Sequence, residues 1–212
     1  EIPIEPSELQ VEIYSALRQS YSGILKMGVN DKSRLGRMGR AVMSLIAASS
    51  NPGLILGRGT EDAFLNLQWP PVEIEDNGEL MAVIGNYVSY EIPPKYKWLA
   101  QFVNHSHQEG KKTLVWSNFV GNLLSLERLL AQYNPAVIHG SVPQEERKEA
   151  LYRFRNNPDC TVLLTNPQTL GEGISLHRVC HQAVYIDRTY NAGHYLQSLD
   201  RIHRLGLSED VI

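Results

Sequence analysis

The sequence has few cysteines and no long apolar run, and each absence excludes a class of protein. Cys160 and Cys180 are the only cysteines among 212 residues, too few for a disulfide framework, and they fit a reducing cytosolic compartment. No apolar run approaches the ~18–20 residues that a bilayer-spanning helix needs. The acidic, proline-marked N-terminus is unlike a signal peptide. We therefore expect a cytoplasmic protein without membrane contact.

The chain also lacks an overall positive charge. The net charge is −3 and the pI about 6.2, so any contact with nucleic acid must come from a local patch. The one sizeable basic run, Arg34, Arg37 and Arg40, is most simply a solvated helix face. With 42% hydrophobic and 20% charged residues, the chain has an ordinary globular composition, enough for one large or two small domains.

Two phosphate-handling motifs are missing as well. The sequence contains no G-x-x-x-x-G-K-[S/T] loop to hold the β- and γ-phosphates of a nucleotide, and no acidic DExx-type stretch to hold Mg²⁺. It lacks an initiator methionine and stops at Ile212, where a strand is expected to begin. We therefore expect a fragment of a longer protein, unable to form a complete nucleotide site alone.

The local pattern changes near residue 94. Residues 1–94 predict an N-terminal helical segment with an irregular insertion, including helices over 9–21 and 35–48 and a hairpin strand over 81–84. Residues 95–212 alternate short apolar strands with helices, which predicts an α/β fold with a parallel sheet covered on both faces. Ligands of such sheets bind in the loops after the carboxyl ends of the strands. The expected strands are 113–116, 136–138, 161–164 and 183–186, and the expected helices are 97–105, 123–132, 143–155 and 192–204.

Arg201 and Arg204 are three residues apart, so on a helix they share a face. An arginine is always charged and presents a planar fork of donors suited to phosphate. Paired arginines just before a glycine stop fit a finger that neutralises charge during phosphoryl transfer. The alternative is a solvated helix face on which Asp200 pairs with Arg204 at the i,i+4 spacing.

The flanking chain favours the first interpretation. From Asp187 to Gly206 it closely resembles motif VI and its lead-in in the Swi/Snf-type branch of superfamily-two helicases, including Asn191 and the run Gln197-x-x-Asp200-Arg201-x-His203-Arg204-x-Gly206. The resemblance implies the second RecA-like (P-loop NTPase-like) lobe of such a motor. It implies that Arg201 and Arg204 are catalytic and that Gln197 and Asp200 line the nucleotide cleft.

The stretch Thr165 to Leu176 resembles motif V of the same family, in which nucleotide and nucleic-acid sites are coupled. By this resemblance Gly171, Glu172 and Gly173 lie on the nucleotide side. Swi/Snf proteins usually carry two adjacent glycines before the last one, whereas this chain has Leu170-Gly171-Glu172-Gly173. The departure is nearer to bacterial members of the superfamily, so a bacterial or phage protein associated with the nucleoid is expected. The alternative is a mobile loop without a ligand.

Two further stretches resemble the family's nucleic-acid side. Trp116-Ser117-Asn118-Phe119 resembles the strand end of motif IV, and His139-Gly140-Ser141 followed by Arg147 resembles the Gly-Ser turn that faces a phosphate backbone. Such contacts position a duplex without reading its sequence. Ser141 has an alternative role as a helix N-cap, and Arg147 is expected to be structural rather than catalytic. The residues implied to contact DNA are Ser117, Asn118, Gly140, Ser141, Thr165, Asn166 and Tyr190.

Taken together, the resemblance implies one lobe of an ATP-dependent duplex-DNA translocase, an ATP hydrolase in the full-length protein. ATP and Mg²⁺ would be held mainly by the first RecA-like lobe of the same polypeptide, and duplex DNA is the expected partner. The nearer alternative is a lobe of a helicase that separates DNA or RNA strands, and the alternative from another class is a non-catalytic binding module. A zinc site at His177, Cys180 and His181 is disfavoured because no fourth ligand stands at a suitable spacing.

Overall fold

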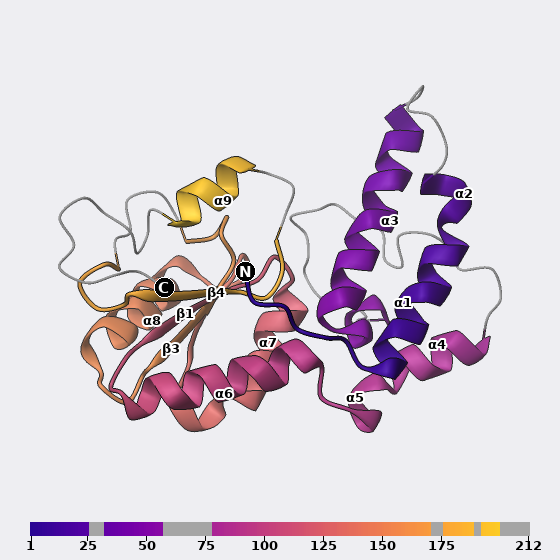
Figure 1. Cartoon of the computed structure of the whole chain (residues 1–212). Helices are drawn as coiled ribbons and strands as arrows, with labels where there is room; N and C mark the ends of the chain where they lie inside the picture. Colours follow the sequence, from indigo (N-terminus) through magenta and orange to yellow (C-terminus); the bar gives the residue numbers. More distant parts are fainter. Residues whose placement is uncertain (26–31, 57–77, 171–175, 189–191, 200–212) are drawn as a thin grey trace. The chain divides into compact units, whose positions relative to one another are not determined.

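The computed structural model describes residues 1–25, 32–56, 78–170, 176–188 and 192–199 (Figure 1). The chain forms two compact units, Glu1–Lys97 and Trp98–Ile212. Each unit has its own buried apolar cluster, so each is described by itself. Within the described residues, no helix is both long and apolar enough to cross a membrane.

The first unit is helical, and polar side chains cap the start of α1 (Glu8–Ser20) and close the turn after α3 (Lys32–Ser50). Ser7 precedes α1, and its hydroxyl accepts a hydrogen bond from the Gln10 backbone amide at 3.1 Å, which satisfies an amide that has no partner within the helix. After α3, the side-chain oxygen of Asn51 accepts from the Gly53 amide at 3.0 Å. The elements are α1 (Glu8–Ser20), α2 (Ser22–Leu25), α3 (Lys32–Ser50), η1 (Pro52–Leu56), α4 (Gly78–Gly85) and α5 (Tyr87–Tyr90).

The core of the first unit confirms the helical periodicity of its sequence. Ile13 and Leu17 lie four residues apart on α1, and both are buried with Leu45 of α3. This spacing places apolar side chains on one face of a helix. The two predicted helices are therefore present, and α3 is longer than predicted at both ends.

Residues 81–84 correct the prediction of a hairpin strand, which is wrong. They belong to α4, where Ile84 is fully buried and packs with Ile13 and Ile55. A short apolar run is compatible with a buried helix as well as with a buried strand. Contacts with distant residues decided between the two, and the local pattern did not contain them.

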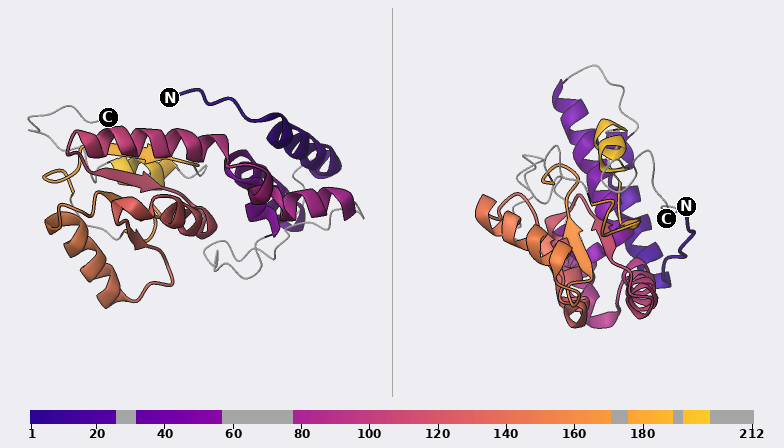
Figure 2. Two further views of the ribbon diagram at one scale, coloured as in Figure 1. Left: turned by 90° about the horizontal axis from the view of Figure 1, so that it is seen from below. Right: turned by 90° about the vertical axis from the view of Figure 1, so that its left-hand side faces the viewer.

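The second unit is a parallel sheet with helices on both faces (Figures 1 and 2). The strand order is β2-β3-β1-β4, and every described pairing is parallel. This confirms the predicted fold class. The elements are α6 (Pro94–Gln108), β1 (Thr113–Trp116), α7 (Val120–Leu129), η3 (Ala131–Tyr133), β2 (Ala136–Ile138), α8 (Gln144–Asn156), β3 (Val162–Thr165), β4 (Gln182–Tyr185) and α9 (Ala192–Leu199).

Most element bounds in this unit lie close to their predictions. β3 and β4 are each displaced by one residue, and the helix predicted over 123–132 is two elements, α7 and η3. The chain turns away after η3 at Asn134, whose φ of 47° lies in the left-handed region, a conformation that asparagine adopts more readily than most residues. Only Ala192–Leu199 of the helix predicted over 192–204 lies among the described residues.

Apolar strands make the sheet core, and α8 covers one of its faces. Leu114 of β1 and Leu163 of β3 are register partners, and both belong to the buried cluster that includes Phe154 of α8. Lys112 fixes the end of α8 against this cluster. Its ammonium group donates to the carbonyl oxygens of Phe154, Asn157 and Cys160 at 2.5, 2.7 and 3.0 Å, a favourable place for a cation because carbonyl dipoles converge at a helix C-terminus.

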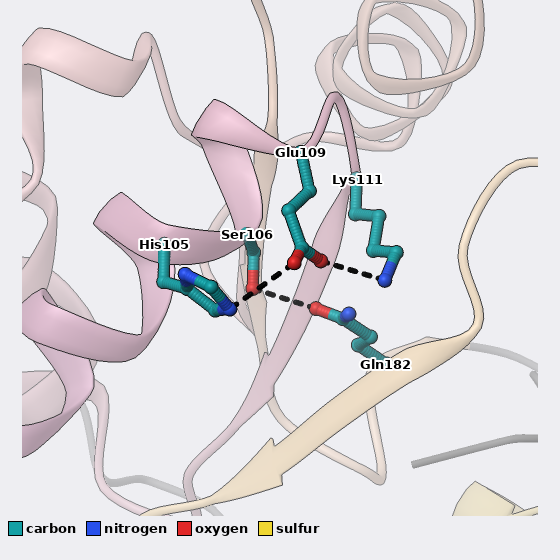
Figure 3. A network of polar contacts seen from close by, with 5 residues as sticks. All are labelled: His105, Ser106, Glu109, Lys111 and Gln182. Carbon is teal, nitrogen blue, oxygen red and sulfur yellow. Dashed lines mark hydrogen bonds and ion pairs between the residues drawn. The ribbon is translucent and has the colours of Figure 1, made fainter.

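Helix α6 is joined to β4 by a polar network at its C-terminal end (Figure 3). The buried Ser106 hydroxyl donates to the side-chain oxygen of Gln182 at 2.7 Å. Beside this bond, Glu109 Oε1 lies 3.2 Å from His105 Nε2, and Glu109 Oε2 lies 2.6 Å from Lys111 Nζ. The Lys111 ammonium lowers the pKa of Glu109, but the group is fully exposed and water screens the pair. The Ser106–Gln182 bond is therefore the part of the network that fixes β4.

Candidate functional site

The carboxyl ends of the strands meet at one edge of the sheet, as they must in a parallel arrangement. Ser117 follows β1, His139 follows β2, Asn166 follows β3, and Ile186 follows β4. Strands β1 and β4 are neighbours, as are β3 and β1. The structure therefore brings most of the residues predicted to contact DNA to a single edge.

Ser117 and Asn118 are held together by one carboxylate, that of Asp187. The Asn118 backbone amide and side-chain amide donate to Asp187 Oδ1 at 2.8 and 2.6 Å. The Ser117 hydroxyl donates to Oδ2, to which the Asn122 amide also donates at 3.0 Å. Asn166 completes the cluster, because its side-chain amide donates to the Ser117 carbonyl oxygen at 2.7 Å.

The hydroxyls of Ser117 and Thr165 point inward. Both side chains are fully buried, and Thr165 is the last residue of β3, where its hydroxyl donates to the Asn166 carbonyl oxygen at 3.4 Å. Asn166 is buried as well, whereas Asn118 is half-buried. Of these four side chains, therefore, only that of Asn118 is partly open to solvent, and a direct contact by Ser117 or Thr165 with a ligand would require their loops to open.

The turn after β2 carries the exposed Ser141. It closes through a hydrogen bond from the Val142 amide to the His139 carbonyl oxygen at 3.0 Å. Arg147 reaches back from α8 and donates to the carbonyl oxygens of Gly140 at 2.5 Å and Val142 at 2.6 Å. The structural role predicted for Arg147 is thus confirmed. The alternative for Ser141 is wrong, because the N-cap position of α8 is Pro143 and has no side-chain cap.

Several predicted residues lie outside the described residues. Gln197 is part of α9, although its side chain is not among those described. The others outside the description are Gly171, Glu172, Gly173, Tyr190, Asp200, Arg201 and Arg204. The nucleotide-facing half of the site therefore stays a prediction, and the structure bears on it only through the element that leads into it, α9.

Helix α9 is anchored to β4 by an aromatic cluster that the sequence did not single out. Tyr195 meets the ring of Tyr185 edge-on at 5.3 Å between centroids, and Trp116 stacks against Tyr185 at 6.2 Å. The Tyr185 hydroxyl is bonded to the Ser198 hydroxyl at 2.5 Å. Arg188 lies over the Tyr195 ring at 4.8 Å, a favourable place for a cation. Burial raises the pKa of Tyr185, so this phenol keeps its proton.

Zinc binding finds no support in the described residues. They contain no group of three or more His, Cys, Asp or Glu side chains that could hold a metal ion. Cys160 and Cys180 are buried free thiols, and burial raises the pKa of both. Both thiols belong to the buried apolar cluster of the second unit, so these cysteines act as core residues.

Comparison with known proteins identifies related sequences. Residues 94–206 match the helicase conserved C-terminal domain. The chain is 26% identical over 218 residues to Protein CHROMATIN REMODELING 4 of Arabidopsis thaliana, a match that covers 100% of this chain and 9% of that protein. The chain therefore spans less than a tenth of the length of this curated relative.

Solved structures share the fold. The chain is similar to the crystal structure of the C-terminal part of the Fun30 ATPase domain, with a TM-score of 0.67 and 19% identity over 99% of this chain and 80% of that chain. It is also similar to the Sulfolobus solfataricus SWI2/SNF2 ATPase core in complex with dsDNA, with a TM-score of 0.58 and 18% identity over 97% of this chain and 37% of that chain. At these identities the likeness shows the fold, and it agrees with the RecA-like lobe predicted from the sequence.

Proposed function

This chain belongs to the helicase conserved C-terminal domain family, and we propose that it is the second motor lobe of an ATP-dependent duplex-DNA translocase of the Swi/Snf type. The observation that carries the proposal is the shared edge of the sheet. Asn118 and the Gly140-Ser141 turn lie at this edge, and Asp187 connects it to the chain that enters α9. The residues proposed to contact DNA and the chain that leads through α9 toward Arg201 and Arg204 thus start from the same edge of the sheet.

On the DNA side, the proposed contacts are directed at phosphates. Ser141 is exposed and Asn118 half-buried, and both offer neutral donors of the kind that commonly bond phosphate oxygens. Tyr190 is proposed to join them. A duplex is favoured as the partner because a structurally similar protein, the SWI2/SNF2 ATPase core of Sulfolobus solfataricus, is described in complex with dsDNA.

On the nucleotide side, Arg201 and Arg204 are proposed to reach the γ-phosphate of ATP when two motor lobes close. Gly171, Glu172, Gly173, Gln197 and Asp200 are proposed to line the cleft. Mg²⁺ and most phosphate contacts would come from the other lobe of the same polypeptide, since this sequence has no phosphate loop. Neutralising charge as it develops on the transferred phosphoryl group is how an arginine finger accelerates hydrolysis.

The spacing of the motif V glycines supports a further proposal about origin. Gly171-Glu172-Gly173 is nearer to bacterial members of the wider superfamily than to the usual Swi/Snf pattern, and a bacterial protein would work in the cytoplasm on nucleoid DNA. The relative reported above is from a plant, so the comparisons do not support a bacterial origin. The proposal therefore depends on the motif alone.

The test is the nucleic-acid dependence of ATP hydrolysis by the intact protein, which holds both lobes. Turnover is measured without nucleic acid, with saturating duplex and with saturating single strands of the same sequence. A translocase of duplex DNA predicts stimulation by the duplex well above that by single strands. Stronger stimulation by single strands would identify a strand-separating helicase, and absence of hydrolysis in all three conditions would identify a binding module.

A further inference from the structure

Asp187 is a buried carboxylate whose described hydrogen-bond donors are all neutral. It is 5% exposed. The Asn118 backbone and side-chain amides donate to Oδ1, and the Ser117 hydroxyl and the Asn122 amide donate to Oδ2. All four donors come from residues 117–122, directly after β1. A single side chain just after β4 therefore holds the loop after β1 together with the first turn of α7.

The choice of a carboxylate here is chemically specific. Removing a carboxylate from water costs several kcal/mol unless hydrogen bonds replace the solvent. Bonds to an ionised acceptor are roughly twice as strong as neutral ones, and a carboxylate accepts on both of its oxygens. An asparagine of the same shape would turn an NH₂ group toward the donors on one side. Position 187 thus requires an acceptor at both oxygens.

The residues just before Asp187 connect the same loop to α9. The Ile186 amide donates to the Trp116 carbonyl oxygen at 3.0 Å. Tyr185 stacks on Trp116 and is bonded through its hydroxyl to Ser198 of α9. Because the Ser198 hydroxyl itself donates to the Tyr195 carbonyl oxygen at 2.7 Å, the Tyr185 hydroxyl is the donor of the pair. Residues 185–187 therefore contact the end of β1 and α9 at once.

We infer that Asp187 is a positioning residue. When DNA binds at the loop after β1, this side chain passes the resulting shift of the loop on to α9. The inference rests on the proposed function, in which Asn118 meets DNA and the chain beyond α9 carries Arg201 and Arg204. A DNA phosphate that binds Asn118 shifts this residue, and with it the backbone and side-chain amides that donate to Asp187 Oδ1. Residues 185–187 follow the carboxylate, and α9 moves with them. Contact with duplex DNA then changes the position of α9, the helix that precedes Arg201 and Arg204 in the sequence.

The test is the Asp187→Asn variant of the intact protein. Its readout is the ratio of ATP turnover with saturating duplex to turnover without DNA. Coupling through the carboxylate predicts that this ratio falls about tenfold or more, while the Kd for duplex changes less than about threefold. The matched control is Asp159→Asn, which changes an exposed carboxylate of the same unit and should keep the wild-type ratio.

Each remaining outcome is decisive. A wild-type ratio in Asp187→Asn overturns the inference. This holds even if turnover with and without duplex falls in proportion, since such a loss marks a merely structural role. If Asp187→Asn fails to fold, Asn118→Ala removes the side-chain donor to Oδ1, and its ratio at saturating duplex is judged in the same way. If the wild-type protein shows no stimulation by duplex, the proposed function itself has failed, a result distinct from loss of coupling in the variant.

Discussion

Arg147 fixes the backbone of Gly140, since its guanidinium donates to the Gly140 carbonyl oxygen at 2.5 Å. A second bond from the same group, to the Val142 carbonyl oxygen, spans the other side of Ser141. The turn proposed to meet a phosphate is therefore shaped by a residue on α8. Its conformation depends on donors from two separate nitrogens of a rigid fork, Nε and Nη2, whereas all donors of a lysine stand on one nitrogen.

The Arg147→Lys variant tests whether this shape matters. It keeps the charge but replaces the planar fork, whose Nε and Nη2 reach the carbonyl groups on either side of Ser141, by donors on a single nitrogen. Because a hydrogen bond of this kind contributes about 0.5–1.5 kcal/mol, we expect the affinity of the 212-residue chain for duplex DNA to fall about 3- to 10-fold, measured by fluorescence anisotropy at low salt. The control is Lys148→Arg, which keeps the charge of a side chain paired with exposed Glu145. Equal Kd values for wild type and Arg147→Lys would show that the shape of the turn does not contribute to DNA binding.

The stability of the fold should decrease at alkaline pH because of Cys180. Burial raises the pKa of this thiol from 9.0 to about 11. Between these values the unfolded chain has lost the proton and the folded chain keeps it, so unfolding releases a proton and becomes easier as pH rises. The contribution is fully present below pH ~9 and is lost as pH rises toward ~11, with a total of about 2–3 kcal/mol.

Urea unfolding at a series of pH values between 8 and 11 measures this loss. Cys160 and Tyr185 shift in the same direction through burial, and the lowered pKa of Lys112 acts in the opposite direction. The Cys180→Ala variant isolates the one thiol, since it removes a single titrating group. Its free energy of unfolding should fall less steeply with pH than that of the wild type. Parallel curves would show that Cys180 is accessible to water.

The sequence predicted the regular half of the structure well, because that half is encoded locally. Short apolar runs between helices fixed the parallel sheet, and Ser7 marked the start of α1. The strand predicted over 81–84 failed because a run of four apolar residues has no period that distinguishes strand from helix. Its helical state depends on burial of Ile84 against residues far along the chain.

The sequence predicted that several of the candidate site residues lie together, and their roles stay a prediction. Ser117, Asn118 and Asn166 do lie together, yet the motif VI resemblance marks Asp187, the side chain that joins them, only as its first residue. A signal was present, since an aspartate directly after an apolar strand lies at the ligand-binding edge of a parallel sheet. Inward-pointing hydroxyls cannot be told from outward-pointing ones without the fold, so the sequence did not predict that Ser117 is buried.

The 212-residue chain alone should not hydrolyse ATP. It has neither a phosphate loop nor a carboxylate stretch for Mg²⁺, and both are required to hold the nucleotide in such motors. Phosphate release from the purified chain, with and without duplex, measures this directly. Turnover that disappears in an Arg201→Ala variant would show that the chain holds a complete site and would contradict the assignment to a second lobe.

Binding of duplex DNA by the isolated chain should be weak and strongly dependent on salt. The net charge is −3, and the proposed contacts are directed at phosphates rather than bases. Each neutralised phosphate adds a slope of about −0.9 in log K against log salt concentration. Titrations at a series of KCl concentrations with two unrelated duplexes should give equal affinities. Tight binding to only one sequence at physiological salt would contradict a backbone-directed surface.

The last prediction concerns Arg204 in the intact protein. Replacement by lysine keeps the charge but loses the planar fork and part of the reach. An arginine finger contributes about 10³–10⁵-fold to turnover in related phosphoryl-transfer sites, so a loss of at least ~100-fold is expected for Arg204→Lys. Nucleotide affinity and the Kd for duplex should change little, because a finger acts mainly in the transition state.

The competing interpretation makes a different prediction for the same variant. If Arg204 only pairs with Asp200 on a solvated helix face, the pair contributes about 0.3–0.5 kcal/mol of helix stability, and Arg204→Lys should hydrolyse ATP at close to the wild-type rate. Arg201→Lys belongs in the same experiment, because either arginine could be the one that reaches the phosphate. Normal turnover in both lysine variants would show that neither arginine faces the nucleotide, and the mechanism proposed for this lobe would then be wrong.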